Sequence, residues 1–104
     1  MLDKTPLRVE VATPAPGTVR ISLTGDLAFD TAAKLSGLVF EPGYHRLDLD
    51  LAGISFIDSS GLAALVRLHQ QAESEGAALR LVAVSPHLRR LLKVTALDQL
   101  FRLP

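Results

Sequence analysis

The chain has 104 residues, of which 48% are apolar and 21% are charged, with 11 basic residues, 11 acidic residues and no cysteine. This length and composition are typical of one globular domain and exclude an intrinsically disordered chain. A formal net charge of zero gives no overall basic field for nucleic acid or an anionic membrane surface, and the lack of cysteine excludes disulfides and thiolate chemistry.

The sequence carries no pattern of a membrane span or an export signal. Charged residues interrupt every long apolar stretch, and the segment Met1–Leu7 contains Asp3 and Lys4 in place of an apolar signal core. We therefore expect a cytoplasmic protein that does not insert into a membrane.

Two alternating segments near the N-terminus predict a β-hairpin. Apolar side chains alternate with polar or small ones over residues 7–12 and again over residues 19–24, on either side of the turn-forming segment 13–17. We expect Gly25 to end the second strand. Apolar residues at helical spacing then predict a helix over residues 28–39.

The rest of the chain alternates between strands and helices. The predicted elements are a strand over residues 46–51, after which the apolar run continues to Asp58, a helix from Ser59 or Ser60 to about residue 75, a strand over residues 79–84, a helix that starts at Ser85 and Pro86, and a short helix or strand over residues 97–103. Gly76 is a natural C-terminal stop for the first of these helices. The continuous apolar run over residues 81–84 predicts a strand that is covered on both faces.

The order of these elements predicts an α/β fold in a single domain over residues 1–104. Strands connected through helices pair in parallel with right-handed crossovers, whereas the N-terminal hairpin is antiparallel. We therefore expect a mixed sheet of four or five strands with helices packed mainly on one face.

The segment Asp58-Ser59-Ser60-Gly61 joins a buried strand to a helix and is the main candidate site. Asp and Ser are the favoured residues for capping a helix, and capping is the favoured explanation of the tetrapeptide taken alone. The N–H groups of a helix start lack intrahelical partners and also suit a phosphate, which Ser59 could carry. The strand–turn–helix context at a sheet end, where open α/β folds bind partners, favours this second hypothesis.

Catalysis by Ser59 is not expected, and we interpret the protein as a binding domain rather than an enzyme. An activated serine needs a nearby base, and the three scattered histidines, His45, His69 and His87, share no spacing with it or with a metal site. The segment lacks the Gly-x-Ser-x-Gly pattern of a nucleophile elbow. Neither a phosphate-binding loop nor a dinucleotide-binding motif is present, so no cofactor is expected.

The acidic residues Asp26, Asp48, Asp50 and Asp58 are candidates for a divalent-metal cluster. Asp48 and Asp50 alternate with leucines on a predicted strand, and the spacing does not match a calcium loop. We therefore expect these two side chains to face solvent or a cap, and no metal site.

Two faces of the helix after Ser59 carry apolar or small residues. The predicted core face consists of Leu62, Leu65, Val66 and His69. The second face consists of Gly61, Ala64, Leu68 and Gln71. A second packing contact is the favoured interpretation of this second face, and the alternative is a shallow apolar strip on which another protein docks beside Ser59.

Three segments together resemble the STAS domain family, particularly bacterial anti-sigma factor antagonists. Residues 47–62, from Leu47 to Leu62, are similar to the central motif of that family nearly throughout. Gly25-Asp26-Leu27 with Thr31, Ala32 and Leu35 resembles its earlier loop and first helix, and residues 88–101 resemble its last helix and tail. The resemblance covers essentially the whole chain.

The resemblance implies a bacterial regulator of transcription that works by partner switching. In the family, the serine after the aspartate, which is Ser59 here, is phosphorylated by an anti-sigma factor with a histidine-kinase-like ATP-binding fold. The unphosphorylated form binds that anti-sigma factor and releases a sigma factor, and a phosphatase reverses the modification. The residues predicted to bind the partner are Asp26, Asp58, Ser59, Ser60, Gly61, Ala64 and Leu68.

The chain departs from the family pattern at two positions. Ala28 stands where the family has an aspartate near the phosphoacceptor, and Ala96 stands where a glycine often follows the last helix. The alternative function is a constitutive STAS docking subunit, for example of a phospholipid-transport ABC ATPase, in which the helix docks without phosphorylation.

Overall fold

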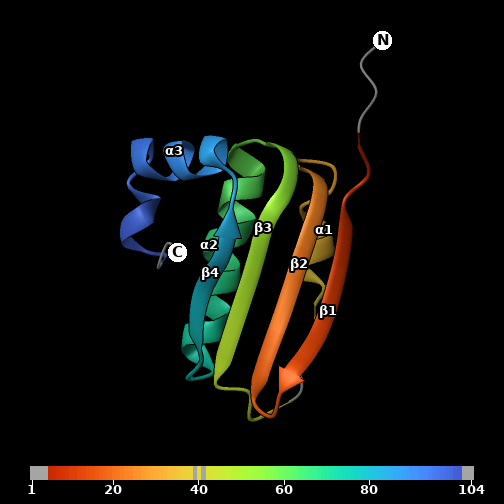
Figure 1. Ribbon diagram of the computed structural model, residues 1–104, viewed down its shortest axis with the longest axis vertical. Coiled ribbons are helices and arrows are strands. Elements are labelled where there is room, and N and C mark those ends of the chain that lie inside the picture. Colours follow the sequence, from red (N-terminus) through yellow and green to blue (C-terminus); the bar gives the residue numbers. More distant parts are fainter. Residues whose placement is uncertain (1–4, 39, 41, 102–104) are drawn as a thin grey trace.

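The computed structural model describes residues 5–38, 40 and 42–101 (Figure 1). Its elements are the strands β1 (Arg8–Ala15), β2 (Thr18–Leu27), β3 (Arg46–Ile57) and β4 (Ala78–Val84), the helices α1 (Ala33–Ser36), α2 (Ser59–Ser74) and α3 (Pro86–Val94), and a short 3-10 helix, η1 (Leu97–Gln99).

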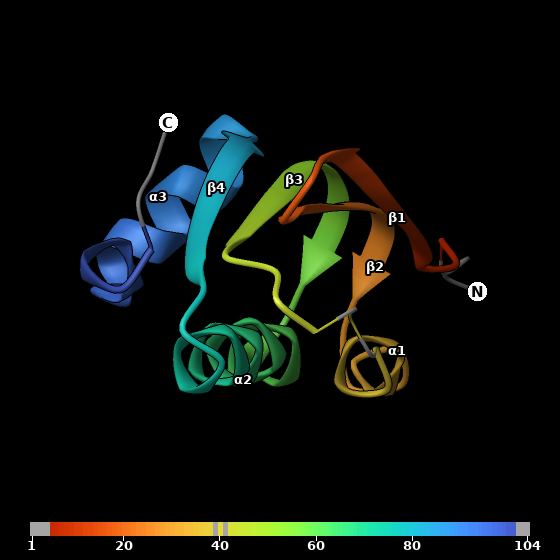
Figure 2. The ribbon, with the colours of Figure 1, turned by 90° about the horizontal axis from the view of Figure 1, so that it is seen from below.

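The four strands form one mixed sheet in the order β1-β2-β3-β4. β1 and β2 pair antiparallel, whereas β2, β3 and β4 run parallel to one another. Helices α1 and α2 lie against one face of the sheet, and α3 with η1 lies beside β4 (Figure 2). The predicted α/β fold is confirmed with four strands. In the short helix or strand predicted over residues 97–103, residues 97–99 form the helix η1, and residues 102 and 103 lie outside the described residues.

The core lies between the sheet and α1 and α2. Leu47, Leu49 and Leu51 of β3 are fully buried, as their alternation predicts. The prediction for Asp48 was wrong, because this side chain is only 2% exposed although it points to the face without helices. Burial of its charge is compensated by an ion pair, in which Arg46 Nε donates to Asp48 Oδ1 at 2.8 Å.

Gly25 does not end β2, which continues to Leu27. The pairing of β2 with β3 shifts between Gly25 and Asp26, and Gly25 adopts a φ of +95°. A Cβ on this residue would lie 2.0 Å from the backbone oxygen of Pro6. The glycine therefore allows a bulge and a close approach of the N-terminal segment within a continuing strand.

The helix predicted over residues 28–39 is much shorter, because α1 has only four residues, Ala33–Ser36. Thr31 organises the preceding turn through its hydroxyl group, which donates to the Asp26 backbone oxygen at 2.7 Å and accepts the Ala28 N–H at 2.9 Å. Side-chain bonds of this kind compete with helical hydrogen bonds, so the turn replaces the first part of the predicted helix.

The predicted stop after α2 and the predicted start of α3 are confirmed, but the predicted burial of β4 on both faces is not. Gly76 follows α2 with a φ of +75°, and the Ser85 hydroxyl accepts the Leu88 N–H at 3.2 Å at the start of α3. β4 is an edge strand whose Ala78 and Arg80 are exposed. Within the predicted run, Leu81 is buried and residues 82–84 are partly buried, so the run reflects only partial coverage.

Helix α2 packs on the sheet through a different face from the one predicted as its core. Its buried residues are Gly61, Ala64, Leu65, Leu68 and Ala72. Of the predicted core face, Leu65 is buried, and Leu62, Val66 and His69 are partly exposed. The His69 ring contacts the Phe101 ring edge-on, with centroids 5.8 Å apart, and so ties the C-terminal segment to α2.

The end of the sheet opposite to the start of α2 is closed by the segment before β3. The Tyr44 hydroxyl donates to the Glu75 carboxylate at the C-terminal end of α2. Burial, followed by this hydrogen bond and the negative charge of Glu75, raises the pKa of Tyr44. Within the described residues, no helix has the length and apolar character needed to cross a membrane.

Candidate functional site

The candidate site lies where β2 and β3 end and α2 begins. Leu27 pairs with Ile57 at the ends of the two strands, and Asp58 and Ser59 follow immediately. The start of α2 is thus held at the carboxyl edge of the parallel strands, as the sequence predicted (Figure 1).

Asp58 is the N-cap of α2, and its carboxylate joins two segments of the chain. Asp58 Oδ1 accepts the N–H of Gly61 at 2.9 Å, which confirms the predicted capping. Asp58 Oδ2 accepts the N–H of Phe29 at 3.1 Å, from the loop after β2. The carboxylate therefore fixes this loop against the start of the helix.

Gly61 is the point of closest approach between α2 and the end of β2. A Cβ on this residue would lie 2.2 Å from the Leu27 backbone oxygen and 2.8 Å from Ile57 Cγ1. Since backbone cannot move aside as a side chain tip can, this position requires glycine. The requirement explains why a glycine follows the two serines.

Ser59 is the first residue of α2, and its side chain is exposed, whereas Ser60 is partly buried. The Gly61 N–H is capped and the Leu62 N–H donates to the Asp58 backbone oxygen at 3.0 Å. For the N–H groups of Ser59 and Ser60, no acceptor is found among the described residues. Two backbone donors and an exposed hydroxyl therefore lie together at the positive end of a helix of sixteen residues.

Asp26 lies on the same edge but is occupied by the N-terminal segment. Its N–H donates to the Thr5 backbone oxygen at 3.1 Å, and its Oδ2 accepts the Thr5 N–H at 3.1 Å. Lys34 also holds this segment, since its Nζ donates to the Leu7 backbone oxygen at 2.9 Å. The pair of bonds gives Asp26 a positioning role that the sequence did not indicate.

Two exposed phenylalanines at this edge were missed by the sequence analysis. Phe29 is 82% exposed and Phe56 is 54% exposed, although large apolar side chains usually seek burial. Phe29 donates its N–H to Asp58, and Phe56 pairs in register with Asp26. The available sequence signal was an aromatic residue directly before Asp30, in the loop that follows β2.

The prediction that Gly61, Ala64 and Leu68 contact a partner was wrong. All three are buried, with Ala64 and Leu68 each 3% exposed, because this face of α2 packs on the sheet. The packing alternative was therefore correct for them. Ser59 and the partly exposed Asp26, Asp58 and Ser60 remain accessible at the same edge.

The acidic residues and histidines in the described part of the chain are spread over separate elements. No three His, Asp or Glu side chains gather there as ligands would. Asp48 and Asp50 lie further back along β3 than Asp58, paired with Arg20 and Ser22 of β2. No hydrogen bond between Ser59 and a histidine is found among the described residues.

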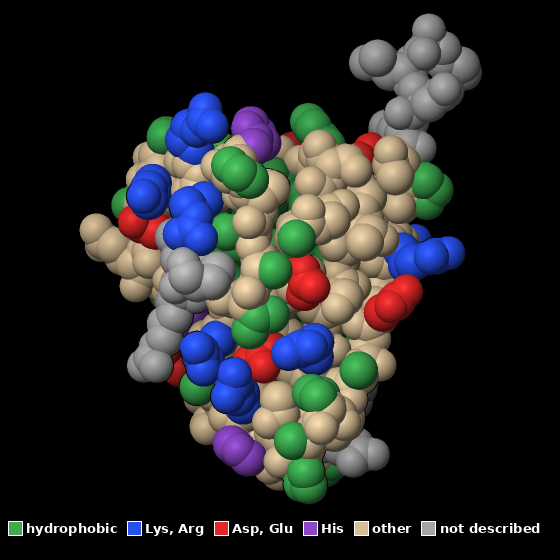
Figure 3. All heavy atoms as spheres, in the orientation of Figure 1, with side chains coloured by type: hydrophobic (Ala, Val, Ile, Leu, Met, Phe, Trp, Pro, Cys, Tyr) green, Lys and Arg blue, Asp and Glu red, His purple; other side chains and the backbone are tan. Residues whose placement is uncertain are grey.

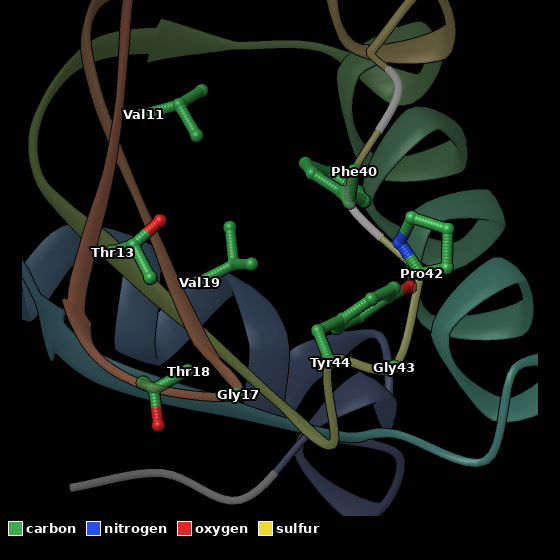
Figure 4. A pocket seen from close by; sticks show the side chains of 9 residues that line it. All are labelled: Val11, Thr13, Gly17, Thr18, Val19, Phe40, Pro42, Gly43 and Tyr44. Atoms are coloured by element: carbon green, nitrogen blue, oxygen red, sulfur yellow. The ribbon is translucent and has the colours of Figure 1, made fainter.

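A separate pocket of about 280 Å³ lies at the opposite end of the sheet (Figure 4). Val11 and Val19 of the hairpin line one side, and Phe40, Pro42 and Tyr44 line the other. Phe40 and Tyr44 pack edge-on with ring centroids 5.4 Å apart. None of the residues predicted for the candidate site lines this pocket.

The family model described as "Mlab, STAS domain" matches residues 12–103. The chain belongs to the STAS domain family. This STAS chain is also 34% identical over 59 residues to a STAS-domain containing protein, PA14_20770, of Pseudomonas aeruginosa strain UCBPP-PA14. That match includes 57% of this chain and spans 58% of the relative's length.

Several solved structures share the fold at low sequence identity. An anti-sigma factor antagonist from Mycobacterium paratuberculosis has a TM-score of 0.75 at 24% identity, covering 93% of this chain and 84% of its own. The phosphorylated form of SpoIIAA, a cell fate determinant of Bacillus, has a TM-score of 0.68 at 22% identity, and the match covers 93% of this chain and 91% of SpoIIAA. A sulfate transporter family protein from Wolinella succinogenes has a TM-score of 0.79 at 24% identity, and the match covers 88% of this chain and 80% of that protein's chain.

Proposed function

We propose that this STAS protein is an anti-sigma factor antagonist that is switched off by phosphorylation of Ser59. In this proposal the unphosphorylated form binds an anti-sigma factor with a histidine-kinase-like ATP-binding fold and thereby releases a sigma factor. The protein acts by binding and has no catalytic activity of its own, and a serine phosphatase restores the binding form.

The observation that carries the proposal is the state of Ser59 at the start of α2. Its hydroxyl is exposed, so a kinase can reach it, and the N–H groups of Ser59 and Ser60 lack acceptors among the described residues. A phosphate on this hydroxyl can accept both N–H groups in the favourable field of the helix dipole. SpoIIAA of Bacillus, which shares this fold, has been solved in a phosphorylated form, and this supports phosphorylation as the kind of switch proposed.

The switch in this proposal depends on charge next to an apolar surface. Phosphorylation adds about two negative charges, and these lie beside the carboxylate of Asp58. Phe29 and Phe56 flank the same edge and offer large apolar side chains for docking. A partner surface that covers these rings would have to desolvate the phosphate, so the modified form binds less well.

Intact mass measurement after incubation with ATP and the kinase-like anti-sigma factor of the same genome tests the modification. We expect an increase of one phosphate, about 80 Da, which is lost in Ser59→Ala. Ser60→Ala is the matched control and should still be phosphorylated. Stable binding of the partner without any added mass would contradict the switch.

Binding measurements with variants test the docking edge independently of the modification. Ser59→Asp should weaken binding of the anti-sigma factor and Ser59→Ala should preserve it, whereas equal affinities would refute the charge mechanism. Phe29→Ser should also weaken binding. The control is Val94→Ser, because Val94 is 79% exposed but lies at the end of α3.

A second candidate function is a constitutive docking subunit of a phospholipid-transport ABC ATPase. The family model that matches the chain is described as the Mlab STAS domain, and Ala28 replaces the aspartate usual beside the phosphoacceptor. This function predicts co-purification with an ATPase subunit, no phosphate on Ser59, and an effect of Ser59→Asp only through packing at the interface.

A further inference from the structure

The face of the sheet that carries no helix has a cross-strand row of charged residues. Ala12 of β1 pairs with Arg20 of β2, Arg20 with Asp48 of β3, and Asp48 with Arg80 of β4. Side chains of register partners point to the same face, and the strand neighbours of Arg20, Asp48 and Arg80 are buried on the helix side. The charged row therefore crosses the open face of β2, β3 and β4.

Arginines outnumber carboxylates in this row. Asp48 is almost fully buried and pairs with Arg46, whose side chain remains 40% exposed. Arg20 and Arg80 are exposed on either side of it, and no ion pair of either is found among the described residues. Three guanidinium groups around one carboxylate leave an excess of two positive charges in a chain whose net charge is zero.

Figure 3 shows this arrangement on the open face, where basic side chains surround an acidic one over the lower half of β2, β3 and β4. Glu10 and Asp50 belong to the next row toward the Ser59 end, paired through Ser22. The basic group is thus bounded on one side by acidic residues. The sequence analysis expected no basic field, and that holds for the whole chain but not for this surface.

We propose that Arg20, Arg46 and Arg80 form a second interaction surface, which binds an acidic face of a partner protein. The buried Asp48 positions Arg46 and offsets part of the repulsion among the three guanidinium groups. Guanidinium groups bind carboxylates in two-point geometry, and strands hold them at fixed spacing. These residues line neither of the two described pockets, so the surface suits a protein face rather than an enclosed small anion.

A protein face fits this surface better than an anionic bilayer. Peripheral proteins hold membranes stably by combining basic residues with inserted apolar groups. The exposed large apolar residues of the described chain are Val11, Phe29, Phe56 and Val94, and none of them belongs to this row. The surface is also distinct from Ser59, so it can be occupied whatever the state of that residue.

NMR titration of the whole chain with a hexaglutamate peptide tests the proposal. We expect shifts in the amide signals of residues 18–22, 46–50 and 78–82, with an affinity that falls as salt is added. The variant Arg20→Gln/Arg80→Gln should weaken binding about fivefold to tenfold. Both residues are exposed, so the variant should keep the spectrum of a folded protein.

The matched control is Arg90→Gln/Lys93→Gln, which removes the same charge from exposed positions of α3. This variant should bind the peptide like the unchanged protein. An equal loss of affinity in both double variants would overturn the proposal, because the attraction would then follow total charge. Binding to phosphatidylserine vesicles that depends on Arg20 and Arg80, without binding to hexaglutamate, would also overturn it in favour of a lipid surface.

Discussion

Helices α2 and α3 follow parallel strands of the same sheet but differ at both ends. Each follows a parallel strand, and each begins with a side chain that accepts the N–H of the third helical residue, Gly61 in α2 and Leu88 in α3. In α2 the first residue is Ser59, which keeps its N–H and presents a hydroxyl. In α3 it is Pro86, which has no N–H to offer.

This difference shows that a capped helix start is not by itself a functional site. Ser85 gives α3 the preferred cap, yet the proline removes a donor that a phosphate would use. At α2 the cap is the carboxylate of Asp58, and the serine after it is left free to react. The function of the position therefore depends on the residue next to the cap.

The largest expected effect comes from Gly61→Ala. The new Cβ would meet backbone at the end of β2, so we expect a loss of about 2–3 kcal/mol in the free energy of unfolding. The corresponding change at α3, Leu88→Ala, creates a cavity instead of a clash. Urea denaturation followed by circular dichroism measures both, and an unchanged midpoint for Gly61→Ala would show that α2 does not rest on Leu27.

The next largest effects on the free energy of unfolding are expected from removing the caps, and these effects should differ between the two helices. Asp58→Ala loses two hydrogen bonds to backbone N–H groups, one of them from Phe29, and should cost about 2 kcal/mol. Ser85→Ala loses one and should cost about 1 kcal/mol. Asp58→Asn retains one acceptor oxygen and should fall between them in the same denaturation assay, and equal costs for both caps would remove the distinction.

The C-terminal ends of the helices predict a stabilising change. Gly76 follows α2 with a positive φ, whereas α3 is followed by Ala96 with a φ of 60°. Ala96→Gly should therefore stabilise the protein by about 0.5–1 kcal/mol, because glycine adopts this conformation without strain. The control Ala63→Gly, on the exposed side of α2, should destabilise it by a similar amount.

The smallest expected effect on stability is that of Ser59→Asp. The side chain is exposed at a helix start, where a negative charge is favourable, so we expect a change within about 0.5 kcal/mol. A melting temperature close to that of the unchanged protein would show that any loss of partner binding arises at the surface. Pro86→Ser, the reciprocal change at α3, should likewise leave the fold intact.

The sequence predicted those features that neighbouring residues determine. The cap at Asp58, the helix start at Ser59 and the stop at Gly76 follow from local hydrogen bonding and backbone freedom. Gly25 was misjudged because its bulge depends on Pro6, almost twenty positions earlier in the chain. Asp48 was misjudged because its burial depends on side chains of two neighbouring strands.

The candidate site was predicted in its chemistry but not in its surface. Asp58 and Ser59 lie where expected, yet the small residues after them let α2 approach the sheet, so Ala64 and Leu68 are buried rather than available for docking. Phe29 is exposed because Asp58 holds its loop at the edge. Hydrophobicity alone therefore does not predict which of these residues are buried and which are exposed.

The paired hydrogen bonds between Thr5 and Asp26 make a natural place for an optical reporter. They hold the N-terminal segment at the same edge as Ser59, and the chain contains no cysteine that would compete for a label. A fluorophore on Thr5→Cys would thus lie next to any protein that covers Phe29 and Phe56. Its emission would follow arrival and departure of that protein in real time, without any change to Ser59.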